Sequence, residues 1–184
     1  TNVGATTMGY NKIHVSWDVP NGTTQPIRLD LYNNADMVTH PGEGHNGYDV
    51  SALYGGQNTW GWNVNRNSKF WIADDFTLNA QSSINEMEFY CYQTGSTTTS
   101  SITAIYLCIY DSQPLDSTAV PIWGSEDTNL LTSTGWTGIY RTTATALTDS
   151  TRPIMKIKAR INTLLPAGTY WVKVAFIGSI ASGP

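Results

Sequence analysis

The sequence predicts an all-β protein, a two-sheet antiparallel β-sandwich with a jelly-roll-like strand order. Short runs of alternating apolar and polar residues recur, turn-forming Gly, Pro, Asn and Asp separate them, and no stretch has a helical period. The 25 Thr, 15 Ser and 14 Asn residues favour strands, turns and loops over helix interiors. A chain of 184 residues fits one such sandwich.

Nine or ten stretches have the alternation expected of strands that cover a core with one face and meet water with the other. The clearest is 153–162, in which Met155 and Ile157 alternate with Lys156 and Lys158. The expected strands are residues 12–20, 26–33, 48–56, 69–78, 84–93, 102–111, 119–124, 136–143, 153–162 and 168–178.

We expect a single domain over residues 1–184, with linker-like ends near 1–10 and 178–184. No internal repeat is visible, which disfavours a propeller or solenoid. The stretch 33–67 is rich in Gly, His and Asn, and only 48–56 within it is strand-like.

The charge pattern excludes several classes of partner. The net charge is −4 and the ten Lys and Arg residues are scattered, so nothing forms a basic stripe for nucleic acid. The sequence has no run of 18 apolar residues that could span a bilayer.

Few lysines beside many Thr, Asn, Gly and Trp are typical of exported proteins, so we expect an extracellular location, secreted or at the cell surface.

The two cysteines, Cys91 and Cys108, lie in two aromatic, β-branched runs joined by a polar loop. If the loop folds back around Thr99 and Ser100, the two thiols face each other, and the pattern then predicts a disulfide. The opposite register buries Met87 with its apolar neighbours and separates the sulfurs, which leaves two buried thiols as the alternative. Their spacing is unlike that of a redox pair or a zinc site.

Aromatic side chains are the main candidates for ligand binding. Tyr54, Trp60 and Trp62 fall in a Gly- and Asn-rich loop, and Trp60 and Trp62 share a face if the segment is extended. Flat indole rings with amides nearby suit a sugar or a protein surface, and a satellite core is the alternative. Trp17, Trp71 and Trp171 fall within strand patterns and are expected in the core.

Carboxylates suggest three further sites. Asp74 and Asp75, where we expect a break or bulge in 69–78, offer oxygen ligands for a structural calcium, or simply form a turn. Glu86 and Glu88 share a strand face and could serve a glycosidase only opposite another carboxylate, about 5–9 Å away. The His and acidic residues of 40–49 could hold a transition metal, although loop ligands are a weak signal.

Several phrases resemble a recurrent jelly-roll or β-sandwich module of secreted, Bacteroidetes-type bacterial surface proteins. They are "IADDFTLNA" at 72–80, "FYCYQTGSTTTSSITAIYLCIYDSQP" at 89–114, "YRTT" at 140–143, "RPIMKI" at 152–157 and "LPAGTYWVKV" at 165–174. The resemblance implies an accessory module attached to other domains, with no catalytic residues to carry over. It does not cover the first 55 residues.

Two "Asp-Ser-Thr" triplets resemble the O-glycosylation acceptor of exported Bacteroidetes proteins. They begin at Asp116 and Asp149, and the resemblance implies sugar on Ser117 and Ser150.

Together these features predict a non-catalytic extracellular module with a structural or adhesive role. Its partners would be other domains or subunits of a surface assembly, or glycans. A carbohydrate-binding module that uses Tyr54, Trp60 and Trp62 is the first alternative, and a jelly-roll glycoside hydrolase is the second.

Overall fold

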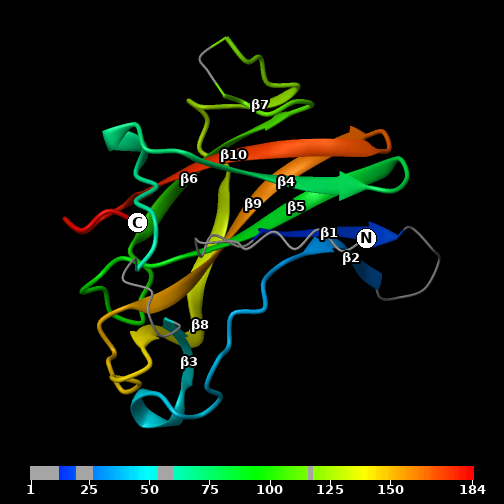
Figure 1. Cartoon of the computed structure of the whole chain (residues 1–184). Coiled ribbons are helices and arrows are strands. Elements are labelled where there is room, and N and C mark those ends of the chain that lie inside the picture. Colours follow the sequence, from blue (N-terminus) through cyan, green and yellow to red (C-terminus); the bar gives the residue numbers. More distant parts are fainter. Residues whose placement is uncertain (1–12, 20–26, 54–59, 116–117) are drawn as a thin grey trace.

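The computed structural model describes residues 13–19, 27–53, 60–115 and 118–184, with the backbone alone up to residue 30. Ten strands and two short 3-10 helices form there, and the strands make two sheets packed face to face (Figure 1). The predicted all-β sandwich is confirmed. Among the described residues, no helix is long and apolar enough to cross a membrane.

The larger sheet has six strands in the order β2-β1-β5-β9-β8-β3, and the smaller has four in the order β4-β10-β6-β7. β4 pairs with β10 while β5 pairs with β9, which is the nested order of a jelly roll. The strands are β1 (Ile13–Val19), β2 (Ile27–Asn33), β3 (Asp49–Leu53), β4 (Ile72–Leu78), β5 (Ser82–Cys91), β6 (Ile102–Tyr110), β7 (Trp123–Ser125), β8 (Leu131–Thr143), β9 (Pro153–Leu165) and β10 (Gly168–Gly178). The 3-10 helices are η1 (His45–Gly47) and η2 (Arg66–Ser68).

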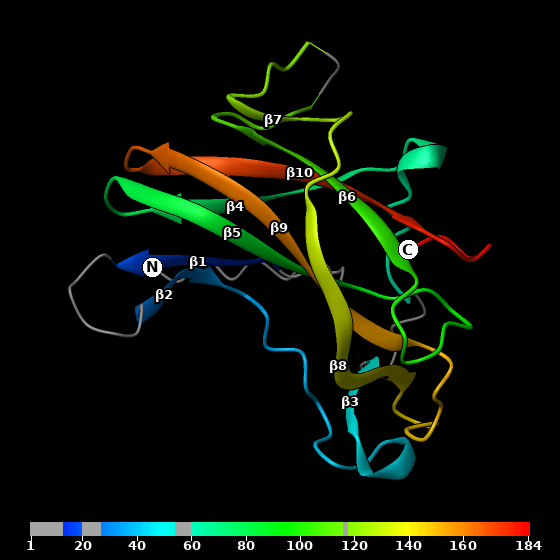
Figure 2. The same cartoon turned by 180° about the vertical axis from the view of Figure 1, so that it is seen from behind.

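One strand pair departs from the antiparallel pattern that the sequence predicts. β3 runs parallel to the second half of β8, from Asp49 opposite Ile139 to Leu53 opposite Thr143. Figure 2, the view from behind, shows that β8 extends beyond the other strands of the sandwich and that β3 lies beside its far end. The register with β9 shifts between Trp136 and Tyr140, where Gly138 has a φ of 83° that disfavours residues with a Cβ.

The core fills the space between the two sheets. Met87 and Phe89 of β5 and Ile157 of β9 face Leu107 of β6 and Phe176 of β10, and all five are fully buried. The rings of Phe89 and Phe176 meet edge to face with centroids 6.2 Å apart. Alternation along these four strands therefore sends every second side chain into a shared core.

The predicted disulfide between Cys91 and Cys108 is wrong, because both thiols are free. β5 and β6 do not form a hairpin: they belong to different sheets, and the loop between them crosses from one sheet to the other. Cys91 points into the core, whereas Cys108 alternates with the core residues Leu107 and Ile109 and so lies on the outer face of the smaller sheet. The two cysteines are therefore structural thiols.

We predict that reductant leaves the stability of the protein unchanged, because no disulfide constrains the unfolded chain. Urea unfolding with and without dithiothreitol should give the same midpoint. Burial raises the pKa of the Cys91 thiol, so this thiol should react with a thiol reagent only after denaturation. A midpoint that falls on reduction would contradict the assignment.

Candidate functional site

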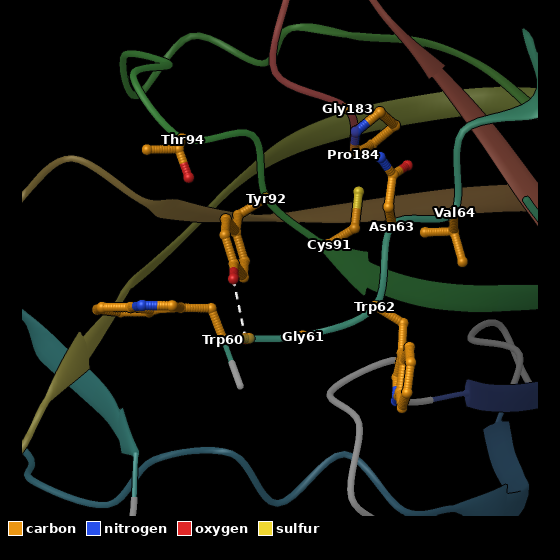
Figure 3. Close-up of a pocket in the computed structure, with 10 residues that line it drawn as sticks. All are labelled: Trp60, Gly61, Trp62, Asn63, Val64, Cys91, Tyr92, Thr94, Gly183 and Pro184. Atoms are coloured by element: carbon orange, nitrogen blue, oxygen red, sulfur yellow. Dashed lines mark hydrogen bonds between the residues drawn. The ribbon is translucent and has the colours of Figure 1, made fainter. Parts of the chain in front are cut away.

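A surface cavity of about 180 Å³ lies where three distant segments of the chain meet (Figure 3). We call it the Trp62 pocket, because Trp62 is its most exposed large side chain, at 64%. Its lining consists of residues 60–64, of Cys91, Tyr92 and Thr94 at the end of β5, and of Gly183 and Pro184. The sequence predicted Trp60 and Trp62 for a site of this kind, whereas Tyr54 lies outside the described residues.

Trp60 and Trp62 do not share a face, because the condition for it, an extended segment, is not met. Figure 3 shows the two indoles pointing away from each other on either side of Gly61. Gly61 has a φ of 156°, so the segment is not the simple extended strand that the prediction assumed. The two rings therefore have separate roles.

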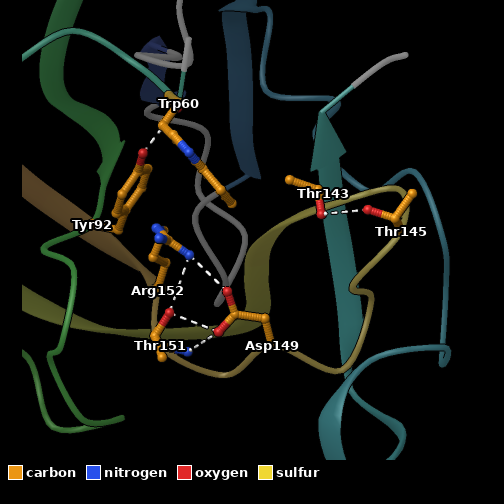
Figure 4. Close-up of polar contacts among 7 residues, drawn as sticks. All are labelled: Trp60, Tyr92, Thr143, Thr145, Asp149, Thr151 and Arg152. Carbon is orange, nitrogen blue, oxygen red and sulfur yellow. Dashed lines mark hydrogen bonds and ion pairs between the residues drawn. The ribbon is translucent and has the colours of Figure 1, made fainter. Parts of the chain in front are cut away.

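Trp60 is fixed in position by contacts with Arg152 and Tyr92 (Figure 4). The guanidinium of Arg152 lies 3.7 Å from the centre of the Trp60 ring, and the Asp149 carboxylate binds that guanidinium at 2.7 Å. The Tyr92 hydroxyl donates a 2.9 Å hydrogen bond to the Trp60 carbonyl. These contacts position the edge of the pocket.

The last residues of the chain form one wall of the pocket, although the sequence predicted a linker near 178–184. The backbone N–H of Val64 donates to the carbonyl of Pro184 at 2.9 Å. The buried amide of Gln93 donates to the carbonyls of Ile180 and Ser182, and the Ser182 hydroxyl donates to the Thr94 carbonyl. The segment 179–184 is therefore packed against the sandwich.

The described lining of the pocket has no charged side chain. No lining residue in the described part of the chain is an Asp, Glu, Lys, Arg or His. Burial raises the pKa of the Cys91 thiol. Burial also raises the pKa of Tyr92, and the nearby charges of Arg141 and Arg152 offset this only in part. The pocket can therefore form hydrogen bonds and stack, but it has no group that would exchange a proton near pH 7.

Glu86 and Glu88, the candidate glycosidase residues, lie on the outer face of the larger sheet and bind lysines. The Nζ atom of Lys158 lies 2.9 Å from Glu86 and 2.7 Å from Glu88, and the Tyr90 hydroxyl donates to Glu88 at 3.2 Å. Lys156 is 3.9 Å from Glu88. This arrangement gives both carboxylates a structural role in joining β5 to β9.

Asp74 and Asp75 lie on opposite faces of β4, and the expected break between them is absent, since β4 pairs with β10 without a register shift. Asp74 is half-buried beside the Asn34 amide, and burial raises the pKa of its carboxyl. Asp75 is exposed opposite Trp171. The two carboxylates therefore do not share a calcium site.

The loop of residues 40–49 likewise forms no metal centre. The Asp49 carboxylate accepts the backbone N–H of Gly42 at 2.8 Å, and the His45 ring packs edge-on against Tyr140. Over the residues that the structure describes, no three His, Cys, Asp or Glu side chains lie close enough to hold a metal ion.

Two tryptophans predicted for the core lie on the outer face of the smaller sheet. Trp171 alternates with the buried Val172, and Trp71 packs against the Lys173 ammonium, 5.0 Å from its ring centre. Both indoles are half-buried. Period 2 groups residues by face, but does not say which face meets the other sheet. The side chain of Trp17 lies outside the described part.

Sequence reasoning missed most of the pocket, namely Asn63, Tyr92, Thr94 and the segment 183–184. These residues come from three segments far apart in the chain, so no local pattern could have joined them. Of the expected glycosylation sites, Ser117 lies outside the described residues. Ser150 is half-buried in the turn before β9, beside the Asp149 carboxylate that binds Thr151, and its modification stays a prediction.

No protein-family model matches the chain, and neither the curated proteins nor the solved structures contain a match to it. The functional argument therefore depends on the residues of the site.

We predict that Lys158→Met lowers the free energy of unfolding by about 1–3 kcal/mol at pH 7, because Glu88 is only 6% exposed and would lose its nearest cation. Lys156→Met is the matched control: this lysine is 43% exposed and more distant, so its loss should cost about 0.5 kcal/mol or less. Urea unfolding of both variants measures the difference, and equal effects would contradict the assignment.

The ion pairs of Lys158 with Glu86 and Glu88 also predict that the free energy of unfolding depends on pH. Burial alone would lower the pKa of Lys158, but its hydrogen bonds to Glu88 and Glu86 outweigh burial and raise this pKa. The stabilisation is therefore complete below the unfolded lysine pKa of about 10.4, and is lost as the pH rises through the folded pKa. The difference between wild type and Lys158→Met should accordingly shrink at strongly alkaline pH.

We predict that Arg152→Leu destabilises the protein by about 1–2 kcal/mol and alters tryptophan fluorescence, because it removes the cation beside Trp60 and the partner of Asp149. Burial would raise the pKa of Asp149, but hydrogen bonds from Thr151 and the charge of Arg152 outweigh it and lower this pKa. The stabilisation is thus present above the unfolded Asp pKa of about 3.9 and is lost as the pH falls through the lower folded pKa.

The difference between wild type and Arg152→Leu in urea midpoint should therefore narrow as the pH falls below about 4. Arg160→Leu, at an exposed position of β9 opposite Glu86, is the control and should leave the fluorescence unchanged. A fluorescence change as large in the control would contradict the role of Arg152.

Proposed function

We propose that this chain is a non-catalytic, extracellular β-sandwich module that serves adhesion by binding a ligand at the Trp62 pocket. The observation that carries the proposal is the chemistry of the pocket: an exposed indole, an amide, hydroxyls and backbone groups surround it, with no charged side chain among its described lining residues. Such a set suits recognition, because proton transfer at neutral pH needs a group with a pKa near 7.

The carboxylates outside the pocket support the non-catalytic part of the proposal. Glu86 and Glu88 share Lys158, and Asp149 binds Arg152, so these acids have structural partners. The exported location is supported by the low lysine content and the many Thr and Asn residues of the sequence.

The test is retention on immobilised ligands. Wild-type protein should bind at least one surface in a panel of glycans and extracellular proteins, and Trp62→Ala should lose that binding. Phe70→Ala is the matched control, because Phe70 is a 52% exposed aromatic residue that does not line the pocket. Equal retention of the two variants, or no retention of wild type, would overturn the pocket as the adhesive site. Wild-type protein that releases reducing sugar from the bound glycan would overturn the non-catalytic role.

A further inference from the structure

The size of the Trp62 pocket suits a single ring of a ligand. Its volume of about 180 Å³ equals that of about six water molecules in the liquid. Pockets for drug-sized molecules span about 300–1,000 Å³. An extended chain of rings would not fit inside, so a polymeric ligand would enter by one end.

The hydrogen-bonding groups around the pocket suit hydroxyl groups. The Asn63 Oδ1 atom accepts the backbone N–H of Asn65 at 3.0 Å, which leaves the amide nitrogen as the group that this side chain offers as a donor. The Tyr92 hydroxyl donates to the Trp60 carbonyl, so its oxygen offers an acceptor. The exposed side chain of Thr94 both donates and accepts. A ligand rich in hydroxyls matches this mixture, because each hydroxyl also donates and accepts.

The electrostatics disfavour a charged ligand. A carboxylate or ammonium group would lose water on entering, and no described lining side chain supplies an opposite charge. A wholly apolar ligand fits no better, since it would offer no partner to the amide nitrogen of Asn63 or to the hydroxyl of Thr94. An uncharged polyhydroxyl ring satisfies both constraints.

Trp62 adds a stacking surface to the pocket. The segment 179–184, which forms one wall, is already packed against the sandwich. The 64% exposed indole of Trp62 can contact the C–H face of a sugar. Pro184 is buried and its carbonyl accepts a hydrogen bond from the backbone N–H of Val64. The buried Gln93 donates a hydrogen bond to the carbonyl of Ile180, in the segment before Pro184. Binding would not have to order this wall first, which limits the entropic cost of recognition.

We infer that the Trp62 pocket binds one uncharged sugar ring, at the end of a glycan, by hydrogen bonds with Asn63, Tyr92 and Thr94 and by stacking on Trp62. This inference rests on the proposed function, and it names the ligand class of the same site.

The experiment is an NMR titration of the whole chain with a panel of uncharged methyl pyranosides and with the uronic acid counterpart of each. At least one uncharged pyranoside should shift the indole N–H of Trp62 in a saturable way. The matching uronic acid should bind at least ten-fold more weakly. The affinity should also be constant from pH 5 to 9, since no described lining group titrates in that range.

Three variants locate the binding. Trp62→Ala should weaken it at least ten-fold, whereas Phe70→Ala should not change it. Thr94→Val keeps the shape of an exposed side chain and removes its hydroxyl, and should weaken binding by about three- to ten-fold. Urea unfolding verifies that each variant is folded, and equal affinity in wild type, Trp62→Ala and Thr94→Val would overturn the inference.

The outcomes separate this inference from the proposed function. If no pyranoside binds but a charged or peptide ligand from the panel of surfaces shifts Trp62, the sugar inference fails and the adhesive pocket stands. If no ligand of either panel shifts Trp62, both fail.

Discussion

The contact between Phe89 and Phe176 represents the constraint on which the rest of the structure depends: two sheets share a core, and the central strands supply it with alternate residues. The two rings meet across the sandwich with both side chains fully buried. Because side chains alternate along a strand, burial of Phe89 places Glu88 on the outer face of β5 and Cys91 in the core. The parity of each strand thus assigns its other residues their environment.

This parity explains why the carboxylates of β5 are structural. Glu86 and Glu88 emerge on the outer face of the larger sheet, where β9 presents Lys158 and Lys156 at the same level. A buried carboxylate needs a partner, and Glu88 finds it in Lys158 and in the Tyr90 hydroxyl. The acidic pair therefore joins two neighbouring strands through their side chains as well as their backbones.

The Trp62 pocket forms at the end of β5, where the alternation stops. Beyond Cys91 the chain leaves the larger sheet and crosses to β6, and Gln93 turns inward to hold the segment 179–184. The loop that carries Trp60 and Trp62 is held there by Arg152 and by Tyr92. Rings, amides and hydroxyls from three segments of the chain therefore meet at this crossing.

The sequence by itself determined the fold class, the approximate ranges of the strands, and the grouping of residues by face, as in the alternation of 153–162. It also identified Trp60 and Trp62 as residues of a candidate site. Only the tertiary structure decided that β5 and β6 lie in different sheets, that Cys91 and Cys108 are apart, that Trp71 and Trp171 face outward, and that 179–184 completes a pocket. The physical reason is that a period of two is a local property. Which face meets the other sheet, and which segments meet at its end, depends on contacts between residues distant in sequence.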